Sequence, residues 1–253
     1  MTIRAVSFDL FDTLVDLLSE GIPMEDYGGR SVPWMLARVH ALVDAKIPLD
    51  FDDYLRVMKG VDEAFRESHF AQGREVSSLE RFRAVLEEIG TGDEDLAHAM
   101  VEAHMEGLYR QVRVLDHHPE VLTELGRELR LGVCSNFSHS KTAYRVLQAA
   151  ELGDSMDAVL ISDAVGYRKP GPEIFRATLE ALAVEPQELL HVGDRLGADV
   201  QGAAALGIRT VWIDRRVKDA EAALAARPGC IPDFQISDLS ELPALVSEAA
   251  GLS

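Results

Sequence analysis

Five short apolar segments, each closed by Asp, Ser or Gly, constrain the fold of this chain more than any other feature. They occupy residues 3–8, 131–134, 158–161, 189–192 and 210–213. Runs this short, β-branched or Leu-rich, are typical of strands covered on both faces. Helical periodicity separates the later four, at residues 140–150, 171–182 and 199–206, and a weaker strand at 234–236 precedes a last helix. Strand and helix therefore alternate, which predicts a doubly wound parallel sheet.

The interval from residue 17 to about residue 113 interrupts this alternation. It carries only helical patterns, at residues 32–43, 51–65, 78–89 and 93–112. A single helical insertion after the first strand explains both observations. We therefore expect an α/β fold with a Rossmann-like core of residues 1–16 and 114–253 and a helical bundle at residues 17–113.

Charge excludes some classes of partner. The 253 residues include 25 basic and 43 acidic side chains, a formal net charge of −18. A protein this acidic repels nucleic acid and anionic membranes, which attract Lys and Arg clusters. No signal peptide and no apolar run of roughly 18 residues is found, so a cytoplasmic location is expected. The two cysteines, Cys134 and Cys230, lack metal-type spacing and are expected to be free thiols.

Polar residues follow the predicted strands where each strand ends. Because parallel strands bring their carboxyl ends to one edge of the sheet, these residues should converge at one site. They are Asp9 and Asp12 after the first strand, with the aromatic Phe11 between them, Ser135 and Asn136 after the second, Lys169 before the helix at 171–182, and Asp194 and Asp199 after the fourth strand.

This ordered set of four motifs resembles the haloacid dehalogenase-like hydrolases, in the subfamily with a helical cap inserted after the first motif. The resemblance implies that Asp9 is a nucleophile that forms a covalent aspartyl intermediate, which water then hydrolyses. It also implies that Ser135 and Asn136 bind and orient the transferring group and that Lys169 neutralises charge. Phe11 is expected beside them, at the substrate.

The two aspartates after the fourth strand, Asp194 and Asp199, concern a possible metal site. The resemblance implies that a Mg²⁺ ion is bound by oxygen ligands from Asp9, Asp194, Asp199 and the main-chain carbonyl of Phe11. Without a cation, a phosphate would face at least two carboxylates at about 4 Å, each repelling it by roughly several kcal/mol. The pair therefore favours phosphoryl transfer. Asp199 could also be a helix N-cap, and the two roles are compatible.

One position departs from the family pattern. Phosphatases of this type usually carry a second aspartate two residues after the nucleophile as general acid and base, where this chain has Phe11. An aromatic residue there is similar to 2-haloacid dehalogenases, whose halide leaves without a proton. Asp12 is a candidate substitute, although a step of three residues ordinarily aims a side chain elsewhere.

Several functions therefore stay open. The leading one is a Mg²⁺-dependent phosphatase of a small, anionic phosphorylated metabolite. A carbon–halogen hydrolase acting on 2-haloacids is the first alternative, and a weakly active binding or regulatory module is the second. A phosphonate-cleaving enzyme would need a cap lysine, for which Lys59 is a weak candidate.

Overall fold

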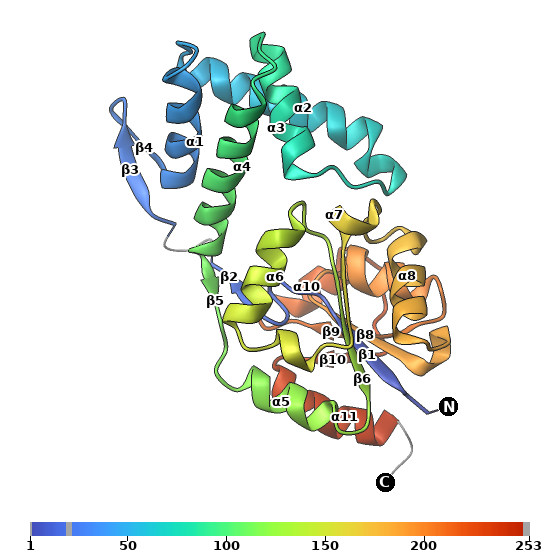
Figure 1. Ribbon diagram of the computed structural model, residues 1–253. Coiled ribbons are helices and arrows are strands. Elements are labelled where there is room, and N and C mark those ends of the chain that lie inside the picture. The colour runs from blue at the N-terminus through green and yellow to red at the C-terminus, as the bar shows by residue number, and fades with distance from the viewer. Residues whose placement is uncertain (1, 19–21, 250–253) are drawn as a thin grey trace. The chain divides into compact units, whose positions relative to one another are not determined.

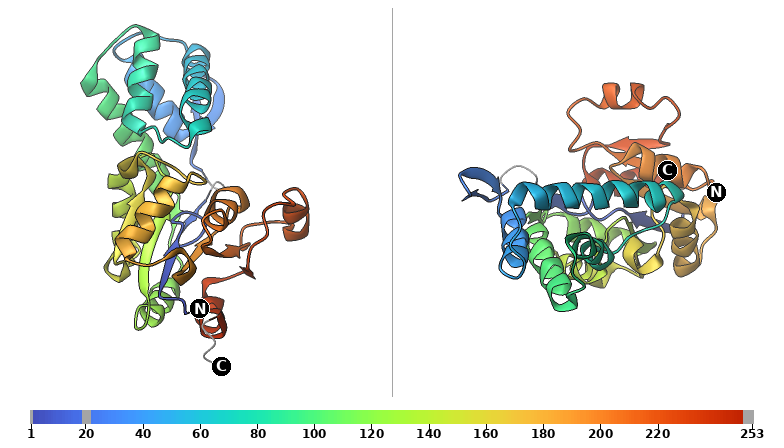
Figure 2. Two further views of the ribbon diagram at one scale, coloured as in Figure 1. Left: turned by 90° about the vertical axis from the view of Figure 1, so that its right-hand side faces the viewer. Right: turned by 90° about the horizontal axis from the view of Figure 1, so that it is seen from above.

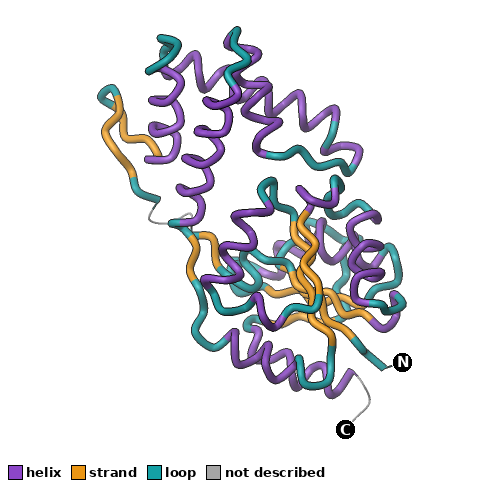
Figure 3. Tube along the Cα trace, viewed as in Figure 1, coloured by secondary structure: helices purple, strands orange, loops and turns teal. Residues whose placement is uncertain are grey.

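The computed structural model describes residues 2–18 and 22–249. The chain divides into two compact units, one of Met1–Asp16 with Val114–Ser253 and one of Leu17–Arg113. Each is described by itself. Figure 1 labels the elements, and Figure 3 shows the strands gathered within one unit while the other is largely helical.

The first unit is built on six parallel strands. Their order across the sheet is β10-β9-β8-β1-β6-β7, and every pairing is parallel. The strands are β1 (Ala5–Phe8), β6 (Arg130–Ser135), β7 (Ala158–Ile161), β8 (Leu189–Gly193), β9 (Arg209–Ile213) and β10 (Phe234–Ile236). All six predicted strands are present, and the α/β fold class expected from their alternation with helices is confirmed.

The strand order places a switch point beside β1. After β1 the chain builds β6 and β7 on one side, then crosses to build β8, β9 and β10 on the other. Open α/β sheets bind ligands outside the carboxyl ends of their strands at such a reversal. The ends of β1 and β8 therefore define where a site is expected.

Helices complete this unit. They are α5 (His118–Leu125), α6 (Ser140–Ala149), α7 (Ser162–Val165), α8 (Pro172–Leu182), α9 (Gln201–Ala204), α10 (Ala220–Ala225) and α11 (Leu242–Ala249). The helix predicted at 199–206 instead begins as a π-helical turn, Leu196–Val200, which continues into α9. The segment between β9 and β10, residues 214–233, carries α10 and projects outward from the sheet in both views of Figure 2.

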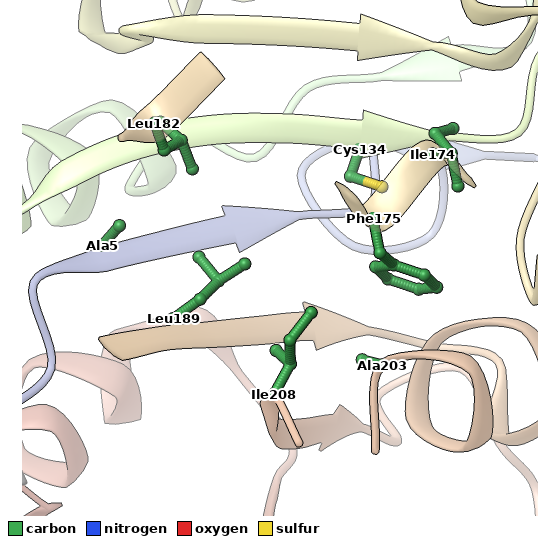
Figure 4. Packing of buried hydrophobic residues seen from close by; sticks show 8 residues of the cluster. All are labelled: Ala5, Cys134, Ile174, Phe175, Leu182, Leu189, Ala203 and Ile208. Atoms are coloured by element: carbon green, nitrogen blue, oxygen red, sulfur yellow. The ribbon is translucent and has the colours of Figure 1, made fainter. Parts of the chain in front are cut away.

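One face of the sheet packs against α8 and α9. The buried cluster there contains residues of β1, β6, β8 and both helices, shown in Figure 4: Ala5, Cys134, Ile174, Phe175, Leu182, Leu189, Ala203 and Ile208. Apolar residues at helical spacing on α8 meet alternate residues of the strands. This packing fixes β1, β6 and β8 relative to one another, so their carboxyl ends are rigidly placed.

Among its described residues, the second unit contains four α-helices and a hairpin. The helices are α1 (Trp34–Asp44), α2 (Phe51–Ser68), α3 (Ser78–Ile89) and α4 (Glu94–Tyr109). The hairpin of β3 (Met24–Tyr27) and β4 (Arg30–Pro33) was not predicted, so the expectation of helical structure alone at 17–113 was wrong. Its turn needs Gly28 and Gly29, which have φ of +61° and +79°.

Two short strands join the units along the chain. They are β2 (Asp16–Leu17) and β5 (Val112–Arg113), which form a two-stranded sheet of their own. Within the described part of the chain, none of the helices is both long and apolar enough to span a bilayer. Cys134 and Cys230 are both buried free thiols, as predicted.

Candidate functional site

Asp9 lies directly after β1 and is 7% exposed. Its Oδ1 accepts hydrogen bonds from the Leu10 amide at 2.7 Å and from the Ser135 hydroxyl at 2.6 Å. Ser135 is the last residue of β6, the strand that pairs with β1. The parallel register thus brings the predicted nucleophile and the predicted hydroxyl into contact.

Lys169 reaches the same point from the segment before α8. Its ammonium group is fully buried and lies 3.2 Å from Asp9 Oδ1 and 2.6 Å from Asp199 Oδ1. It also donates to the Cys134 carbonyl at 2.6 Å. A buried ammonium without partners would be very costly. Here three oxygens surround it, and it bridges two carboxylates.

Two residues that sequence reasoning left outside the site support Asp199. His191, on β8, contacts Asp199 Oδ1 through Nε2 at 3.2 Å, and its Nδ1 lies 2.8 Å from the Ser7 hydroxyl. Burial lowers the pKa of His191, which favours the neutral ring. Nε2–H then donates to Asp199, and the Ser7 hydroxyl donates to Nδ1.

The side chain of Asn136 is hydrogen-bonded to the main chain of Lys169. Its side-chain amide donates to the Lys169 carbonyl at 2.8 Å, and its Oδ1 accepts from the Lys169 amide at 2.7 Å. Both ends of the side chain are therefore used to hold the main chain that carries the ammonium group. These two hydrogen bonds fix the main chain of Lys169 relative to the end of β6.

Asp194 and Asp199 approach closely because the residue before Asp194 is glycine. A Cβ at Gly193 would lie 2.2 Å from Asp199 Cγ, which no side chain can tolerate. One carboxylate oxygen from each of Asp9, Asp194 and Asp199 lies within 4.8 Å of the others. The three predicted carboxylates therefore form one cluster.

The acidities of the cluster follow from burial and from Lys169. Burial raises the pKa of Asp194 to about 8, and the charges on Asp9 and Asp199 add to this effect. Burial also raises the pKa of Asp9, against the opposing ammonium charge. For Asp199, burial acts in the same sense, but Lys169 and His191 outweigh it and hold the pKa below its usual range. The charge of Lys169 therefore acts mainly on Asp199.

Asp194 carries an unsatisfied oxygen. Its Oδ1 is buried and has no hydrogen-bond partner, while its main-chain carbonyl accepts from the Trp212 indole at 2.9 Å. A buried carboxylate oxygen without a donor is rare and costly. By contrast, both oxygens of Asp199 are engaged, since Oδ2 accepts from the Arg195 amide at 2.9 Å.

Phe11 and Asp12 each contact another side chain of this unit. The Phe11 ring packs on Phe137, with 4.7 Å between the ring centroids. Asp12 has a φ of +57°, and its Oδ1 lies 3.0 Å from Arg216 Nε. The site thus has an aromatic wall at the position where a second aspartate is usual.

Arg215 and Arg216 were missed at the sequence level. Arg215 donates to Asp16 Oδ1 at 2.6 Å, and Arg216 also lies 3.7 Å from Asp16 Oδ2. Both follow β9 at the same edge of the sheet. The residues after the fifth predicted strand were not considered, and the reasoning used for the other strands would have found them.

A cavity of about 590 Å³ opens beside the cluster. Lys169 and Asp194 line it, together with three arginines, Arg168, Arg195 and Arg227. Arg227 follows α10 in the chain and packs over Gly197, where a Cβ would lie 2.6 Å from its Nη1. In a chain with a net charge of −18, three guanidinium groups at one cavity favour an anionic ligand.

A second group of potential metal ligands has a simpler explanation. His117, His118 and Asp238 lie close enough to share an ion. His117 Nε2 is 2.8 Å from Asp238 Oδ1, and His118 Nδ1 donates to the Leu14 carbonyl at 2.7 Å. Arg215 lies 3.5 Å from the remaining nitrogen of His118. Hydrogen bonds account for this cluster, and the nearby guanidinium opposes a cation.

Comparisons with known proteins agree with this geometry. A family model described as a haloacid dehalogenase-like hydrolase matches residues 3–207. The phosphoserine phosphatase of Thermus thermophilus is 32% identical, over 94% of this chain and 97% of that protein. The glyceraldehyde 3-phosphate phosphatase of Pyrococcus abyssi is 30% identical, over 83% of this chain and 81% of its own. The family resemblance seen in the four motifs is confirmed.

A solved structure supports the fold. The 2-haloacid dehalogenase from Pseudomonas syringae superposes with a TM-score of 0.69 at 24% identity, covering 98% of this chain and all of that one. At this identity the likeness concerns the fold alone.

Proposed function

The chain belongs to the haloacid dehalogenase-like hydrolases, and from this premise we propose that it is a Mg²⁺-dependent phosphatase of a small anionic metabolite. The observation that carries the proposal is the cluster of Asp9, Asp194 and Asp199, in which Asp9 and Asp199 are buried and one oxygen of Asp194 is left unsatisfied. The inserted unit, residues 17–113, is assigned as the cap, and residues 1–16 with 114–253 as the catalytic core.

The residues present fit a hard cation. Three clustered carboxylates face one buried ammonium, that of Lys169. The orphaned Oδ1 of Asp194 needs either a donor or a cation, and carboxylate oxygen is the ligand that Mg²⁺ prefers. Asp9, Asp194 and the main-chain carbonyl of Phe11 would hold the ion. When bound, it would neutralise the charge of a substrate phosphate.

The full hydrogen bonding of Asp199 changes its expected role. Both of its oxygens already accept from Lys169, His191 and the Arg195 amide. We therefore assign it to fixing Lys169 and the charge balance of the cluster, in place of direct contact with the ion.

Asp9, Lys169 and Ser135 have separate tasks in the proposed reaction. The Asp9 carboxylate attacks phosphorus and forms an aspartyl phosphate. Lys169 and Ser135, both already at Asp9 Oδ1, stabilise charge on the transferring group in a site that needs no reorganisation. Water then cleaves the intermediate and restores the carboxylate.

The chemistry of the substrate follows from the cavity and from the relatives. Arg168, Arg195 and Arg227 would bind a further anionic or polar group next to the phosphate. Two relatives are named for phosphoserine and glyceraldehyde 3-phosphate, both small phosphorylated metabolites. The substrate class is proposed, and no particular metabolite is assigned.

One observation favours a second candidate, a 2-haloacid dehalogenase. The aromatic pair of Phe11 and Phe137 supplies an apolar wall beside the nucleophile. A halide leaving group would need no proton donor there. Such a reaction would proceed without a divalent ion.

The two candidates are separated by a panel of phosphate monoesters and 2-haloacids, each assayed with Mg²⁺ and with EDTA. Under the proposal, phosphate release requires Mg²⁺, and Asp9→Asn abolishes it. Halide release that is unaffected by EDTA would establish the dehalogenase. If Mg²⁺ binds but neither product forms, the chain is a binding or regulatory module, and the phosphatase proposal is wrong.

A further inference from the structure

The position two residues after the nucleophile has no proton to give. It is Phe11, and its ring is held against Phe137 with 4.7 Å between centroids and an angle of 52° between the planes. Both rings are only partly exposed. An aromatic pair cannot protonate a departing oxygen or take a proton from water.

The carboxylate of the next residue, Asp12, pairs with an arginine. The Asp12 amide donates to the Val15 carbonyl at 2.6 Å, which with the φ of +57° fixes the turn. The Asp12 carboxylate pairs with Arg216 at 3.0 Å, and Arg216 belongs to the group that also contains Arg215 and Asp16. A carboxylate that faces a guanidinium accepts hydrogen bonds and donates none. The Asp12 side chain is therefore held in an ion pair with Arg216.

The other carboxyl groups of the cluster have tasks of their own. Asp9 is the proposed nucleophile and Asp194 the proposed ligand of the ion. Asp199 is engaged through both oxygens. With Asp194 engaged by the ion, this cluster has no carboxylic acid left for the leaving group, among the residues that the structure describes.

We propose that this site selects phosphate compounds whose leaving group departs as a stable anion, namely acyl and aryl phosphates, over alkyl phosphates. The inference rests on the proposed phosphatase function and narrows its substrate class. It also separates this chain from the relatives named for alkyl phosphates.

The chemical steps need no proton donor for such substrates. In the first, a bond forms between an Asp9 oxygen and phosphorus, and the bond from phosphorus to the leaving oxygen breaks. The electron pair stays on that oxygen, which departs as a carboxylate or phenolate. In the second, water adds to phosphorus, the bond to Asp9 breaks, and the carboxylate is restored. Both protons of the water remain on the released dihydrogen phosphate until they exchange with solvent.

The size of the preference follows from leaving-group basicity. Carboxylic acids have a pKa of about 4 and phenols of about 10, whereas alcohols lie near water, at about 16. General acid help is typically worth about 10² to 10⁴ in rate. An alkyl phosphate loses this whole factor here, and an acyl phosphate loses little of it.

The test measures kcat/KM in Mg²⁺ for acetyl phosphate, a series of substituted phenyl phosphates and an alkyl phosphate. We expect kcat/KM to fall steeply as the pKa of the leaving group rises. Phe11→Asp should increase the alkyl-to-aryl ratio by about 10-fold or more, because it supplies the missing acid. The matched control Phe11→Leu removes the ring without adding an acid and should keep the steep dependence.

The outcomes separate this inference from the proposed function. Hydrolysis by the wild type that is Mg²⁺-dependent but insensitive to leaving-group pKa would overturn the inference and leave the phosphatase intact. Absence of hydrolysis of every phosphate compound would overturn the phosphatase proposal itself. The wild-type series alone decides the first question, so the result does not depend on whether the variants fold.

Discussion

The two units of the molecule differ in how deeply their paired charged side chains are buried. In the α/β unit, Asp9, Lys169 and Asp199 are nearly or fully buried, and the Lys169 ammonium lies within hydrogen-bond distance of both carboxylates. In the helical unit, ion pairs such as Arg30 with Asp52 have side chains that are 54% and 52% exposed. The helical core is built instead from apolar and aromatic side chains, among them Tyr54, Phe82 and Met100.

This difference indicates where the chemistry is. Exposed ion pairs are worth about 0 to 1 kcal/mol, and water can replace either partner. Removing ions from water costs several kcal/mol each, and a paired arrangement offsets this only when its geometry is good. A cluster of buried charges is therefore retained for a task other than stability, and strongly shifted pKa values at such clusters are typical of functional sites.

The largest effect is expected from Asp9→Asn. An amide is a poor nucleophile, so kcat for a phosphate ester in Mg²⁺ should fall by roughly 10³-fold or more. The surface carboxylate variant Asp52→Asn, in the helical unit, provides the control and should keep its turnover. Comparable activity in both variants would mean that burial of the carboxylate does not mark the nucleophile.

Lys169→Met tests how much the buried ion pairs contribute to the free energy of unfolding. It leaves Asp9 and Asp199 buried without their cation, so the free energy of unfolding should fall by about 3–5 kcal/mol. Lys46→Met breaks a surface pair with Asp93, whose side chains are 51% and 28% exposed, and should cost at most about 1 kcal/mol.

The readout can be restricted to one unit. The chain has two tryptophans, and Trp212 is fully buried in the α/β unit. In a Trp34→Phe background, urea unfolding followed by tryptophan fluorescence therefore reports the α/β unit for Lys169→Met, and in a Trp212→Phe background Trp34 reports the helical unit for Lys46→Met. Equal losses for the two lysine variants would remove the distinction between the two kinds of ion pair.

Asp194→Asn examines the metal. The wild-type melting temperature should rise on addition of Mg²⁺, because an ion that binds only the native state stabilises it. We expect the variant to bind Mg²⁺ about 10-fold more weakly or worse, since it loses one charged ligand. Titration calorimetry measures this directly, and an unchanged affinity would move the ion away from Asp194.

The smallest effect concerns a histidine of the helical unit. His104 packs edge-on against Phe82, and burial lowers its pKa to about 4. The unfolded chain therefore binds a proton below about pH 6.5 that the native state takes up only near pH 4. Stability should decline as the pH falls through this window, and His104→Gln should reduce that slope. The 59% exposed His98 offers the control, and His98→Gln should leave the slope in place.

The strands of the core could be predicted because each is a short apolar run closed by a polar residue. The hairpin β3–β4 could not, since its strands read Met-Glu-Asp-Tyr and Arg-Ser-Val-Pro and lack apolar alternation. Its formation depends on a turn of two glycines in the left-handed region.

Of the site, the residues at strand ends were predictable and their partners were not. Ser7 and His191 are opposite each other in the register of β1 and β8, which a single sequence does not reveal. The same holds for the amide of Asn136, predicted to orient the substrate but hydrogen-bonded to the main chain of Lys169. Contacts across the fold depend on register and on loop paths, and local patterns carry no record of either.

The missing side chain of Gly193 has a consequence for variation in this chain. The separation between the Asp194 and Asp199 carboxylates depends on an atom that is not there, because a methyl group would lie 2.2 Å from Asp199 Cγ. In a saturation library, position 193 should therefore be as intolerant as the nucleophile, although it offers no functional group to any ligand. Random mutagenesis would register it as essential, and the reason would be steric.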